Sequence, residues 1–265
     1  MITLDGHKLS EFGLFCEKQA HPMTPTIENK SLSIPGKDGL YNFGSEIRER
    51  TLGFTLATID ANKVLLQRKL RKFTAFLFDS FGKPREINLT FDYEPDKYYR
   101  TKLASEINPD RILRTGKFEI NFTCYDPYAY SVFYADEICW GNEIITFEYD
   151  YLMGHEGTTG LIHLTQPRTL LATVDGLAVK PIIEVSGSAN GLSLFTGNYV
   201  INFPNFSNAA WVIDCDKYTV LKNGVNGFNE AKLREFILTP GVNFIDMTAS
   251  TIDISIQIKF RDKYI

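Results

Sequence analysis

The feature that most constrains the fold is a run of strict alternation near the end of the chain. Five apolar residues alternate with five polar ones: Ile252, Ile254, Ile256, Ile258 and Phe260 with Asp253, Ser255, Gln257, Lys259 and Arg261. Successive side chains of a strand point to opposite faces, so this period of two predicts a strand with one buried face. A slip of one residue would expose the whole isoleucine row, and we therefore expect a firmly fixed register.

The same alternation recurs in the first part of the chain. It is clearest over residues 51–56, 86–91 and 118–123, and each segment predicts a half-buried strand. Asp126-Pro127 follows the third of these segments, and proline cannot donate to a strand ladder, so we expect that strand to end at Cys124. The first part of the chain is therefore rich in strands.

Residues 60–78 break this pattern and predict an amphipathic helix. Leu66, Leu70, Phe73 and Leu77 fall on one face at helical spacing, and Asp60 is the expected N-cap. Five basic residues occupy the other faces: Lys63, Arg68, Lys69, Arg71 and Lys72. These charges could form a basic stripe that meets a partner, or simply a solvated helix face, which is the more frequent case.

The second part of the chain has no comparable helix and many turn signals. Four of these are Asn-Gly or Gly-Asn pairs, which favour hairpins because both residues tolerate positive φ: Asn190-Gly191, Gly197-Asn198, Asn223-Gly224 and Asn226-Gly227. Short strands are predicted between them, at residues 169–174, 181–185, 199–203, 211–215, 218–221, 236–238 and 242–246. Short, regularly spaced strands are typical of an antiparallel sandwich.

The fold class expected from these patterns is α+β, mainly β, in two domains. The character of the sequence changes between Tyr128 and Gly141, and we place the boundary near Phe133, giving domains 1–133 and 134–265. Charge changes across it: the first domain has 19 Lys and Arg against 17 Asp and Glu, and the second has 9 against 15. The two domains therefore present different electrostatic fields.

Composition excludes several classes of protein. A hydrophobic content of 44% excludes a disordered chain, and no run of 18 apolar residues predicts a membrane span. The N-terminus lacks the apolar core of a secretory leader, and a net charge of −4 argues against a dedicated nucleic-acid binder. The four cysteines form no C-x-x-C pair and are expected to be buried thiols: Cys16, Cys124, Cys139 and Cys215.

The sequence carries no motif for catalysis or cofactor binding. Nucleotide-binding glycine loops, H-E-x-x-H and G-x-S-x-G are all absent. The four histidines are scattered, so no metal site is predicted: His7, His21, His155 and His163. Two carboxylate groups are better interpreted as polar turns than as an acid/base pair: Asp92, Glu94 and Asp96, and the pair Asp214 and Asp216. We therefore predict no catalytic, metal or cofactor-binding residue, and no enzyme.

Aromatic residues are the remaining candidates for binding. Five of them lie beside the predicted domain boundary: Tyr125, Tyr128, Tyr130, Phe133 and Tyr134. Aromatic faces can stack on sugars, but they also fill cores and anchor protein interfaces, and a boundary favours packing. The tryptophans are Trp140 and Trp211, and Trp211 lies in a strand pattern that favours burial in the core. Residues alone thus predict a two-domain, β-rich binding or assembly protein.

Several phrases in order along the chain resemble the distal tail proteins (Dit) of long-tailed phages that infect Gram-positive bacteria. In the first domain they are 34–39 (IPGKDG), 48–52 (RERTL), 89–92 (LTFD), 98–99 (YY) and 122–131 (FTCYDPYAYS). In the second they are 181–188 (PIIEVSGS), 213–214 (ID), 218–220 (YTV), 223–224 (NG) and 240–243 (PGVN). The C-x-D-P-x-x-x-S ending of the first domain is the most specific element. In the phrase at 34–39, Pro35 and the two glycines predict a tight loop, because glycine is free to take positive φ.

This resemblance implies a structural role without catalysis or cofactor. An N-terminal β-sandwich with its helix would form a homo-hexameric ring around the DNA channel, and a C-terminal sandwich resembling galectins and carbohydrate-binding modules would project outward. The implied partners are the major tail tube protein, the tail-associated tip protein and, at the periphery, a receptor-binding protein, with DNA only passing through. The implied location is the virion tail tip, after synthesis in the bacterial cytoplasm, with no insertion into a membrane.

One departure from the family concerns the second domain. Some members carry a long arm-like insertion there that grips receptor-binding proteins, whereas residues 134–265 leave little room beyond the sandwich. An alternative function is that of a cell-wall saccharide-binding module acting in host adsorption, which requires an exposed aromatic with polar neighbours in a concave site. A glycan-degrading enzyme would need two facing carboxyls, and the sequence offers no convincing pair.

Overall fold

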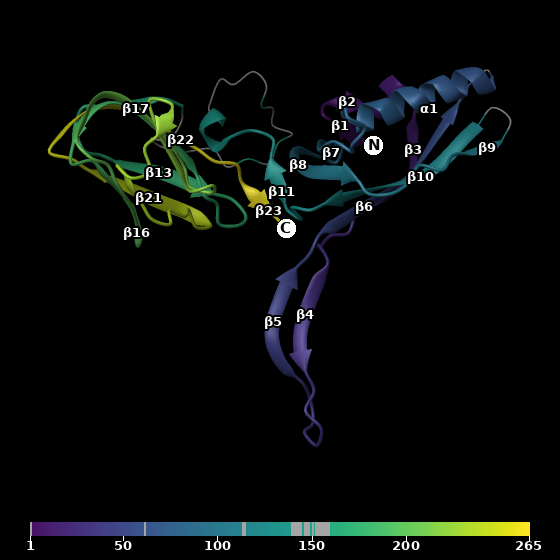
Figure 1. Ribbon diagram of the computed structural model, residues 1–265, viewed down its shortest axis with the longest axis horizontal. Helices are drawn as coiled ribbons and strands as arrows, with labels where there is room; N and C mark the ends of the chain where they lie inside the picture. Colours follow the sequence, from purple (N-terminus) through teal and green to yellow (C-terminus); the bar gives the residue numbers. More distant parts are fainter. Residues whose placement is uncertain are drawn as a thin grey trace. The chain divides into compact units, whose positions relative to one another are not determined.

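The computed structural model (Figure 1) describes residues 2–60, 62–112, 115–138, 145, 149, 151 and 160–265. It divides into two compact units, Met1–Ala129 with Ile265, and Tyr130–Tyr264. The N-terminal unit contains one α-helix, α1 (Lys63–Leu77), and a short 3-10 helix at Leu9–Phe12. Its strands are β1 (Ile2–Leu4), β2 (His7–Lys8), β3 (Phe15–Ala20), β4 (Ile27–Leu32), β5 (Tyr41–Ile47), β6 (Arg50–Ile59), β7 (Ile87–Phe91), β8 (Glu94–Leu103), β9 (Asp110–Ile112) and β10 (Thr115–Cys124).

Apart from β4 and β5, which pair with each other, the strands of the N-terminal unit are antiparallel and follow the order β2-β1-β7-β8-β10-β6-β3, with β9 added beside β10. The longest pairing joins β6 and β10, from Arg50 opposite Cys124 to Ile59 opposite Thr115. The predicted strands at 51–56, 86–91 and 118–123 are confirmed, and β10 ends at Cys124 as Asp126-Pro127 predicted.

Helix α1 buries the predicted face, formed by Leu66, Leu70, Phe73 and Leu77. The ring of Phe73 packs edge-on to Phe12 and lies beside Phe118 of β10, at centroid distances of 5.5 and 6.3 Å. This apolar contact holds the helix against the unit, and its other faces remain available to solvent.

The predicted N-cap of α1 is wrong. The helix begins at Lys63, and Asn62 caps it: the side-chain oxygen of Asn62 accepts the N–H groups of Val64 and Leu65 at 3.0 and 2.9 Å. Asn62 has extended φ and ψ, and in this conformation its side chain can accept the free N–H groups of the first helical turn. The carboxylate of Asp60 instead lies 2.9 Å from Nζ of Lys69.

The C-terminal unit is a sandwich of two antiparallel sheets, ordered β12-β22-β14-β17-β18-β19 and β13-β21-β15-β16-β20. Its first strands are β11 (Ala129–Ser131), β12 (Ile162–Leu164), β13 (Thr169–Val174), β14 (Ile182–Asn190), β15 (Ser193–Thr196), β16 (Tyr199–Asn202) and β17 (Phe206–Asp214). The remaining strands are β18 (Thr219–Lys222), β19 (Val225–Asn226), β20 (Lys232–Leu233), β21 (Gly241–Thr248), β22 (Thr251–Lys259) and β23 (Lys263–Tyr264). A 3-10 turn spans Ala135–Glu137.

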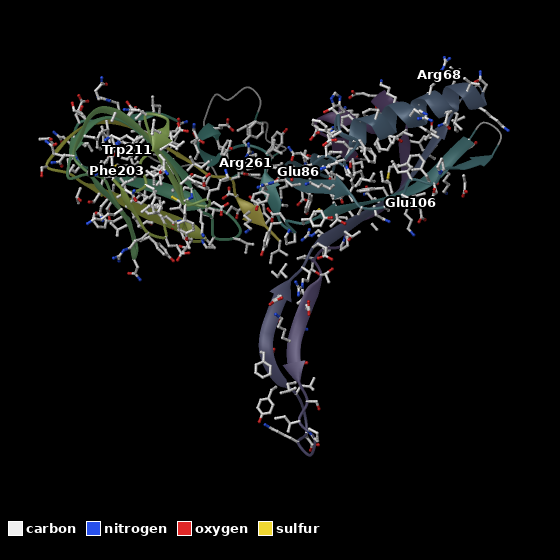
Figure 2. The ribbon with its side chains drawn as sticks, in the orientation of Figure 1. Arg68, Glu86, Glu106, Phe203, Trp211 and Arg261 are labelled. Carbon is white, nitrogen blue, oxygen red and sulfur yellow. The ribbon has the colours of Figure 1, made fainter. Side chains whose placement is uncertain are left out.

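The alternating segment at the end of the chain forms β22, a strand paired on both sides. It lies between β12 and β14, and Ile254, Ile256 and Ile258 are buried on its inner face. Trp211 of β17 is fully buried in the same core, as predicted, and Figure 2 shows it close to Phe203. The expected mainly β fold with one amphipathic helix is confirmed.

The turn signals of this unit were only partly right. Gly197-Asn198 joins β15 to β16, and Asn223-Gly224 joins β18 to β19, each as a two-residue hairpin. Asn190-Gly191 instead carries the chain from β14 in one sheet to β15 in the other, and Asn226-Gly227 leaves the edge strand β19. A local turn signal marks a change of direction, but it does not select the strand with which the chain pairs next.

Residues 236–238 also differ from the prediction. This segment forms no strand, only an isolated bridge between Leu238 and Val179. Phe236 and Leu238 are nevertheless fully buried in the core. The apolar pattern of residues 236–238 therefore indicates burial in the core and not pairing in a sheet.

The C-terminal unit should lose stability as pH rises through about 6 because of Asp262. Burial raises the pKa of Asp262 from an ordinary value of 3.8 to about 6, although its carboxylate accepts the N–H of Asp175 at 2.9 Å. A carboxyl with a raised folded pKa contributes its full stability below the unfolded pKa and loses that contribution as pH rises through the folded one. We expect Asp262→Asn to be about 1–3 kcal/mol more stable than wild type at pH 8.

The measurement is the thermal unfolding temperature from pH 4 to pH 8 in the full chain. Asp216→Asn serves as the control, because Asp216 is exposed. The difference between Asp262→Asn and wild type should grow with pH, while the control follows wild type. An equal pH profile for the two proteins would contradict the prediction.

Candidate interaction surfaces

An isolated two-stranded ribbon is the most unusual feature of the N-terminal unit. Strands β4 and β5 pair from Ile27 opposite Ile47 to Leu32 opposite Tyr41, and we call residues 27–47 the ribbon (Figure 1). It is inserted between β3 and β6, which are themselves neighbours in the sheet. Within the described residues, β4 and β5 pair with no strand but each other. Both outer edges of the ribbon therefore present unpaired backbone groups.

The half of the ribbon near the sheet is charged, and Arg48, which directly follows the ribbon, helps to neutralise it. Arg48 lies 2.6 Å from the Glu28 carboxylate and 3.1 Å from that of Glu46, and Lys30 also pairs with Glu46. These exposed pairs stabilise the ribbon only weakly, by up to about 1 kcal/mol each. Their main consequence is that this half has little net charge to attract a polyanion.

The far half of the ribbon is apolar and exposed. Leu40 and Phe43 are each 67% exposed, and three further apolar side chains are between 42% and 52% exposed: Leu32, Ile34 and Tyr41. Gly36 and Gly39 in the connecting loop have φ of 84° and 86°, so the predicted tight loop is confirmed and forms the end of the ribbon. A two-stranded hairpin is only marginally stable in water, and an exposed apolar cluster on it indicates a surface that becomes covered.

A buried polar cluster fixes the point where the ribbon leaves the sheet. His21 follows β3 and Arg50 begins β6, so these residues stand at the two roots of the ribbon. The hydroxyl of Tyr99 bonds to both, at 3.0 Å from Nε2 of His21 and 3.1 Å from Nη1 of Arg50. Nδ1 of His21 lies 2.8 Å from the hydroxyl of Tyr93, and its ring stacks on Phe91 at 4.3 Å.

The electrostatics of this cluster favour a neutral histidine beside a buried cation. Arg50 is 1% exposed, and its Nε and Nη2 find no hydrogen-bond partner among the described residues. Burial lowers the pKa of His21; the Glu94 charge opposes this shift, and the nearby Arg50 charge adds to it. Burial also raises the pKa of Tyr99 to about 12, so its hydroxyl stays protonated. Among the described side chains, Tyr99 is therefore the one that hydrogen-bonds to the buried guanidinium.

We expect Tyr99→Phe to lower the free energy of unfolding by about 1–3 kcal/mol, because Arg50 then loses its observed hydrogen bond while still buried. The backbone amides at the roots of the ribbon should also exchange faster with deuterium. Tyr93→Phe is the matched control: Tyr93 is 54% exposed and its hydroxyl bonds to His21 without reaching Arg50. Equal effects of the two substitutions on stability and exchange would contradict this role for Tyr99.

The histidines do not converge. His7 lies 2.9 Å from Glu11, His21 belongs to the ribbon root, and His163 lies 3.4 Å from Asp253, while His155 is outside the described residues. Across the described ranges, no group of three His, Cys, Asp or Glu side chains could hold a metal ion. In the same ranges, no helix has the length and apolar character needed to cross a bilayer.

The carboxylate clusters also have structural roles. Only Asp92 and Tyr93 form the turn after β7, so the predicted turn through Asp96 is wrong: β8 already begins at Glu94. A two-residue hairpin reverses the chain between β7 and β8, so the turn is shorter than the sequence predicted. Glu94 and the buried Asp96 lie 3.2 and 3.3 Å from Nζ of Lys97.

The second carboxylate group, by contrast, forms the turn that the sequence predicted. Oδ1 of Asp214 accepts the N–H groups of Asp216 and Lys217, each at 3.0 Å, immediately after β17 ends. This is the geometry in which an aspartate closes a turn on its own backbone. Asp214 therefore holds the chain where it leaves the strand.

The aromatic and sulfur side chains are spread over different environments. Tyr125 is 72% exposed, whereas Phe133 packs edge-on to Tyr149 and Tyr151 at centroid distances of 5.8 and 6.1 Å. Tyr128, Tyr130 and Tyr134 are half-buried. Cys124 and Cys215 are buried free thiols as expected, but Cys16 is partly exposed; Cys139 and Trp140 are outside the described residues.

The comparison with known families bears on the unit that carries the ribbon. Residues 7–124 match the model of the phage tail protein RIFT-related domain. The ribbon and its root lie wholly inside this tail domain.

The comparison with solved structures covers the whole chain. The Dit protein of phage SPP1, described as a paradigm of the hub adsorption apparatus in phages infecting Gram-positive bacteria, matches with a TM-score of 0.70 and 16% identity over 100% of this chain and 98% of that one. Two structures of the phage P2 baseplate, activated with Ca and with Sr, match with a TM-score of 0.46 at 11% and 12% identity, over 96% of this chain and 92% of theirs. No curated protein sequence matches.

The resemblance to distal tail proteins predicted from the sequence is thus confirmed. Residues 7–124 match the model of a phage tail protein domain, and the entire chain shares the fold of the SPP1 Dit protein. Sequence reasoning missed the ribbon, although it identified the loop at its end. The available signal was the pair of resemblance phrases at 34–39 and 48–52, which flank its second strand.

Proposed function

We propose that the protein is a distal tail protein that forms a hexameric ring at the end of a phage tail tube. The ring would surround the DNA channel and join the tube to the tail tip or baseplate. The observation that carries this proposal is the ribbon: a tail protein domain exposes an apolar ribbon that its own unit leaves uncovered. Head-to-tail contact in a ring needs two different complementary patches on each subunit, and the ribbon supplies one of them.

The proposed role of each domain follows the division of the sequence. Residues 1–133 would form the ring, and residues 134–265 would form a galectin-like module that faces outward. The near balance of 19 basic and 17 acidic residues in the first domain suits a channel that DNA crosses without being held. Partners would be the major tail tube protein, the tail-associated tip protein and, in addition, a receptor-binding protein.

This function is structural rather than enzymatic. Those side chains offered for chemistry by the sequence that the structure describes belong to turns, ion pairs and the ribbon root. The protein would be made in the bacterial host cytoplasm and act in the virion tail. The protein would bind other tail proteins and hold them in fixed positions relative to one another.

The ring is tested by the mass of the full chain in solution over a wide range of concentration, with and without the tail tube protein. Negative-stain images should show closed rings of six. A strict monomer in every condition would overturn the proposal.

The alternative, a saccharide-binding module, has weaker support. Trp211, the described tryptophan, is fully buried and cannot stack on a sugar. The smaller sheet exposes Phe195, 37% exposed and opposite Asp246, and Phe244, 59% exposed. Phe244, the more exposed of the two, stands opposite Leu171 and on the strand of the exposed Val242. Apolar neighbours of this kind offer few groups for reading hydroxyls.

A further inference from the structure

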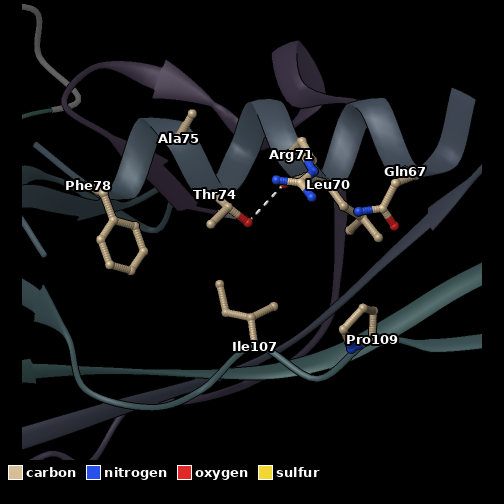
Figure 3. Close-up of a pocket in the computed structure, with 8 residues that line it drawn as sticks. All are labelled: Gln67, Leu70, Arg71, Thr74, Ala75, Phe78, Ile107 and Pro109. Atoms are coloured by element: carbon tan, nitrogen blue, oxygen red, sulfur yellow. Dashed lines mark hydrogen bonds between the residues drawn. The ribbon is translucent and has the colours of Figure 1, made fainter. Parts of the chain in front are cut away.

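A second surface of the N-terminal unit lies along the solvent side of helix α1. A groove of about 440 Å³ runs between the helix and the segment 104–109 that follows β8 (Figure 3). Leu70, Ala75 and Phe78 line it from the helix side, and Ile107 and Pro109 line it from the opposite side. Five of the eight lining residues are thus apolar, the polar ones are Gln67, Arg71 and Thr74, and Arg71 alone of the eight is charged.

The groove continues toward the N-terminus of the helix as a second hollow, because Gln67 and Arg71 line both. The second hollow is lined by Lys63, Arg68 and Arg71 together with Val64, which is 62% exposed. All charged side chains around the combined groove are thus cationic. The sequence left open whether the basic stripe of α1 meets a partner or is simply solvated. In the structure, this stripe borders an apolar hollow.

The charges of α1 fall into two groups. Lys69 pairs with Asp60, and Nζ of Lys72 lies 5.7 Å from the centre of the Phe12 ring, so these two are engaged within the unit. Lys63, Arg68 and Arg71 form no ion pair within the described part of the chain. The helix itself holds five basic residues and no acidic one, so nothing on it screens their mutual repulsion. The unpaired cations are the three that line the groove.

The facing segment does not neutralise them. Its Glu106 accepts a hydrogen bond from Asn108 at 3.3 Å and does not line the groove. Asp110, which begins β9, does not line the groove either. Cations held beside an uncovered apolar hollow match a ligand with the opposite charge and an apolar side chain. Nucleic acid would gain from the cations but nothing from Leu70, Phe78 and Ile107.

We propose that this groove docks an acidic segment of a partner protein. Carboxylates of the segment would pair with Lys63, Arg68 and Arg71, and an apolar side chain would fill the hollow between the helix and Ile107. The site is separate from the ribbon and does not depend on the ring. It makes this side of α1 a second contact surface of the N-terminal unit, in addition to the ribbon.

The test uses the full chain and two fluorescent synthetic peptides of equal charge, one of glutamates interrupted by two leucines and one with glycines in place of the leucines. Anisotropy titrations should show saturable binding of the leucine peptide, at least fivefold tighter than the glycine peptide and weaker at 300 mM than at 50 mM NaCl. Arg68→Glu/Arg71→Glu should weaken binding at least tenfold, and the milder Arg68→Gln/Arg71→Gln should weaken it less. Ile107→Asp, which leaves the cations in place, should remove the preference for leucine.

The matched control is Lys232→Glu/Arg234→Glu, which reverses two exposed basic residues of the C-terminal unit. This variant should bind like wild type, and circular dichroism should confirm that every variant is folded. Equal weakening by the control, equal binding of the two peptides, tighter binding of a DNA duplex than of the leucine peptide, or no saturable binding to wild type would each overturn the proposal.

Discussion

The Leu40→Ser/Phe43→Ser variant should assemble into rings at least about 100-fold less readily than wild type. Both side chains are 67% exposed in the single chain and lie at the apolar end of the ribbon. Covering a large apolar side chain contributes about 1.5–3 kcal/mol relative to leaving it in water, so two of them contribute about 3 kcal/mol or more at each contact. Every 1.4 kcal/mol is a tenfold change in association.

Sedimentation velocity of the full chain over a wide range of concentration measures this effect. The control is Val225→Ser/Phe244→Ser, which removes side chains that are 70% and 59% exposed in the C-terminal unit. Thermal stability should change little in either variant, since these side chains are largely in solvent before assembly. Rings that form equally well from the ribbon variant and from wild type would contradict the assigned role of the ribbon.

Trp211→Ala should destabilise the C-terminal unit by about 3–5 kcal/mol, the range for removing a large aromatic from a packed core. Trp211 is fully buried, and its ring packs edge-on to Phe203 and Phe206 at centroid distances of 5.8 and 6.0 Å. The cavity that remains would be lined by rigid strands of both sheets, which limits relaxation. A loss of this size is a large part of the stability of an ordinary domain.

Calorimetry of the full chain tests this, because each unit has its own set of contacts and should give its own transition. The transition of the C-terminal unit should shift to lower temperature while that of the N-terminal unit stays in place. Val212→Ala is the control, since Val212 follows Trp211 on β17 and is 36% exposed. A shift as small as that of the control would show that the core does not depend on Trp211.

The sequence by itself determined the elements whose periodicity reports burial on one side. The isoleucine row of β22, the helix face from Leu66 to Leu77, and the end of β10 at Cys124 all follow from side-chain spacing and from the missing N–H of proline. Burial on one face is a local pattern, so it can be read without knowing what covers that face. Residues alone placed the chain among β-rich binding or assembly proteins, and the resemblance to distal tail proteins rested on separate sequence phrases.

The ribbon was decided only in the tertiary structure. Both of its faces are exposed, so its sequence carries no alternation between a buried and a solvated side, and only its end loop gave a turn signal. The groove on α1 was likewise invisible as a site: the basic residues were apparent, but the apolar wall that Ile107 and Pro109 provide comes from a segment about 40 residues further along.

Pairing partners, too, were set at the tertiary level. Asn190-Gly191 and Asn223-Gly224 look alike as turns, yet one crosses between sheets and the other closes a hairpin. Tyr99 reaches His21 and Arg50 only because β8 passes beside both roots of the ribbon. Sequence periodicity fixes which side of an element is buried, whereas which elements meet depends on contacts between residues far apart in the chain, and those form only when the whole unit closes around its core.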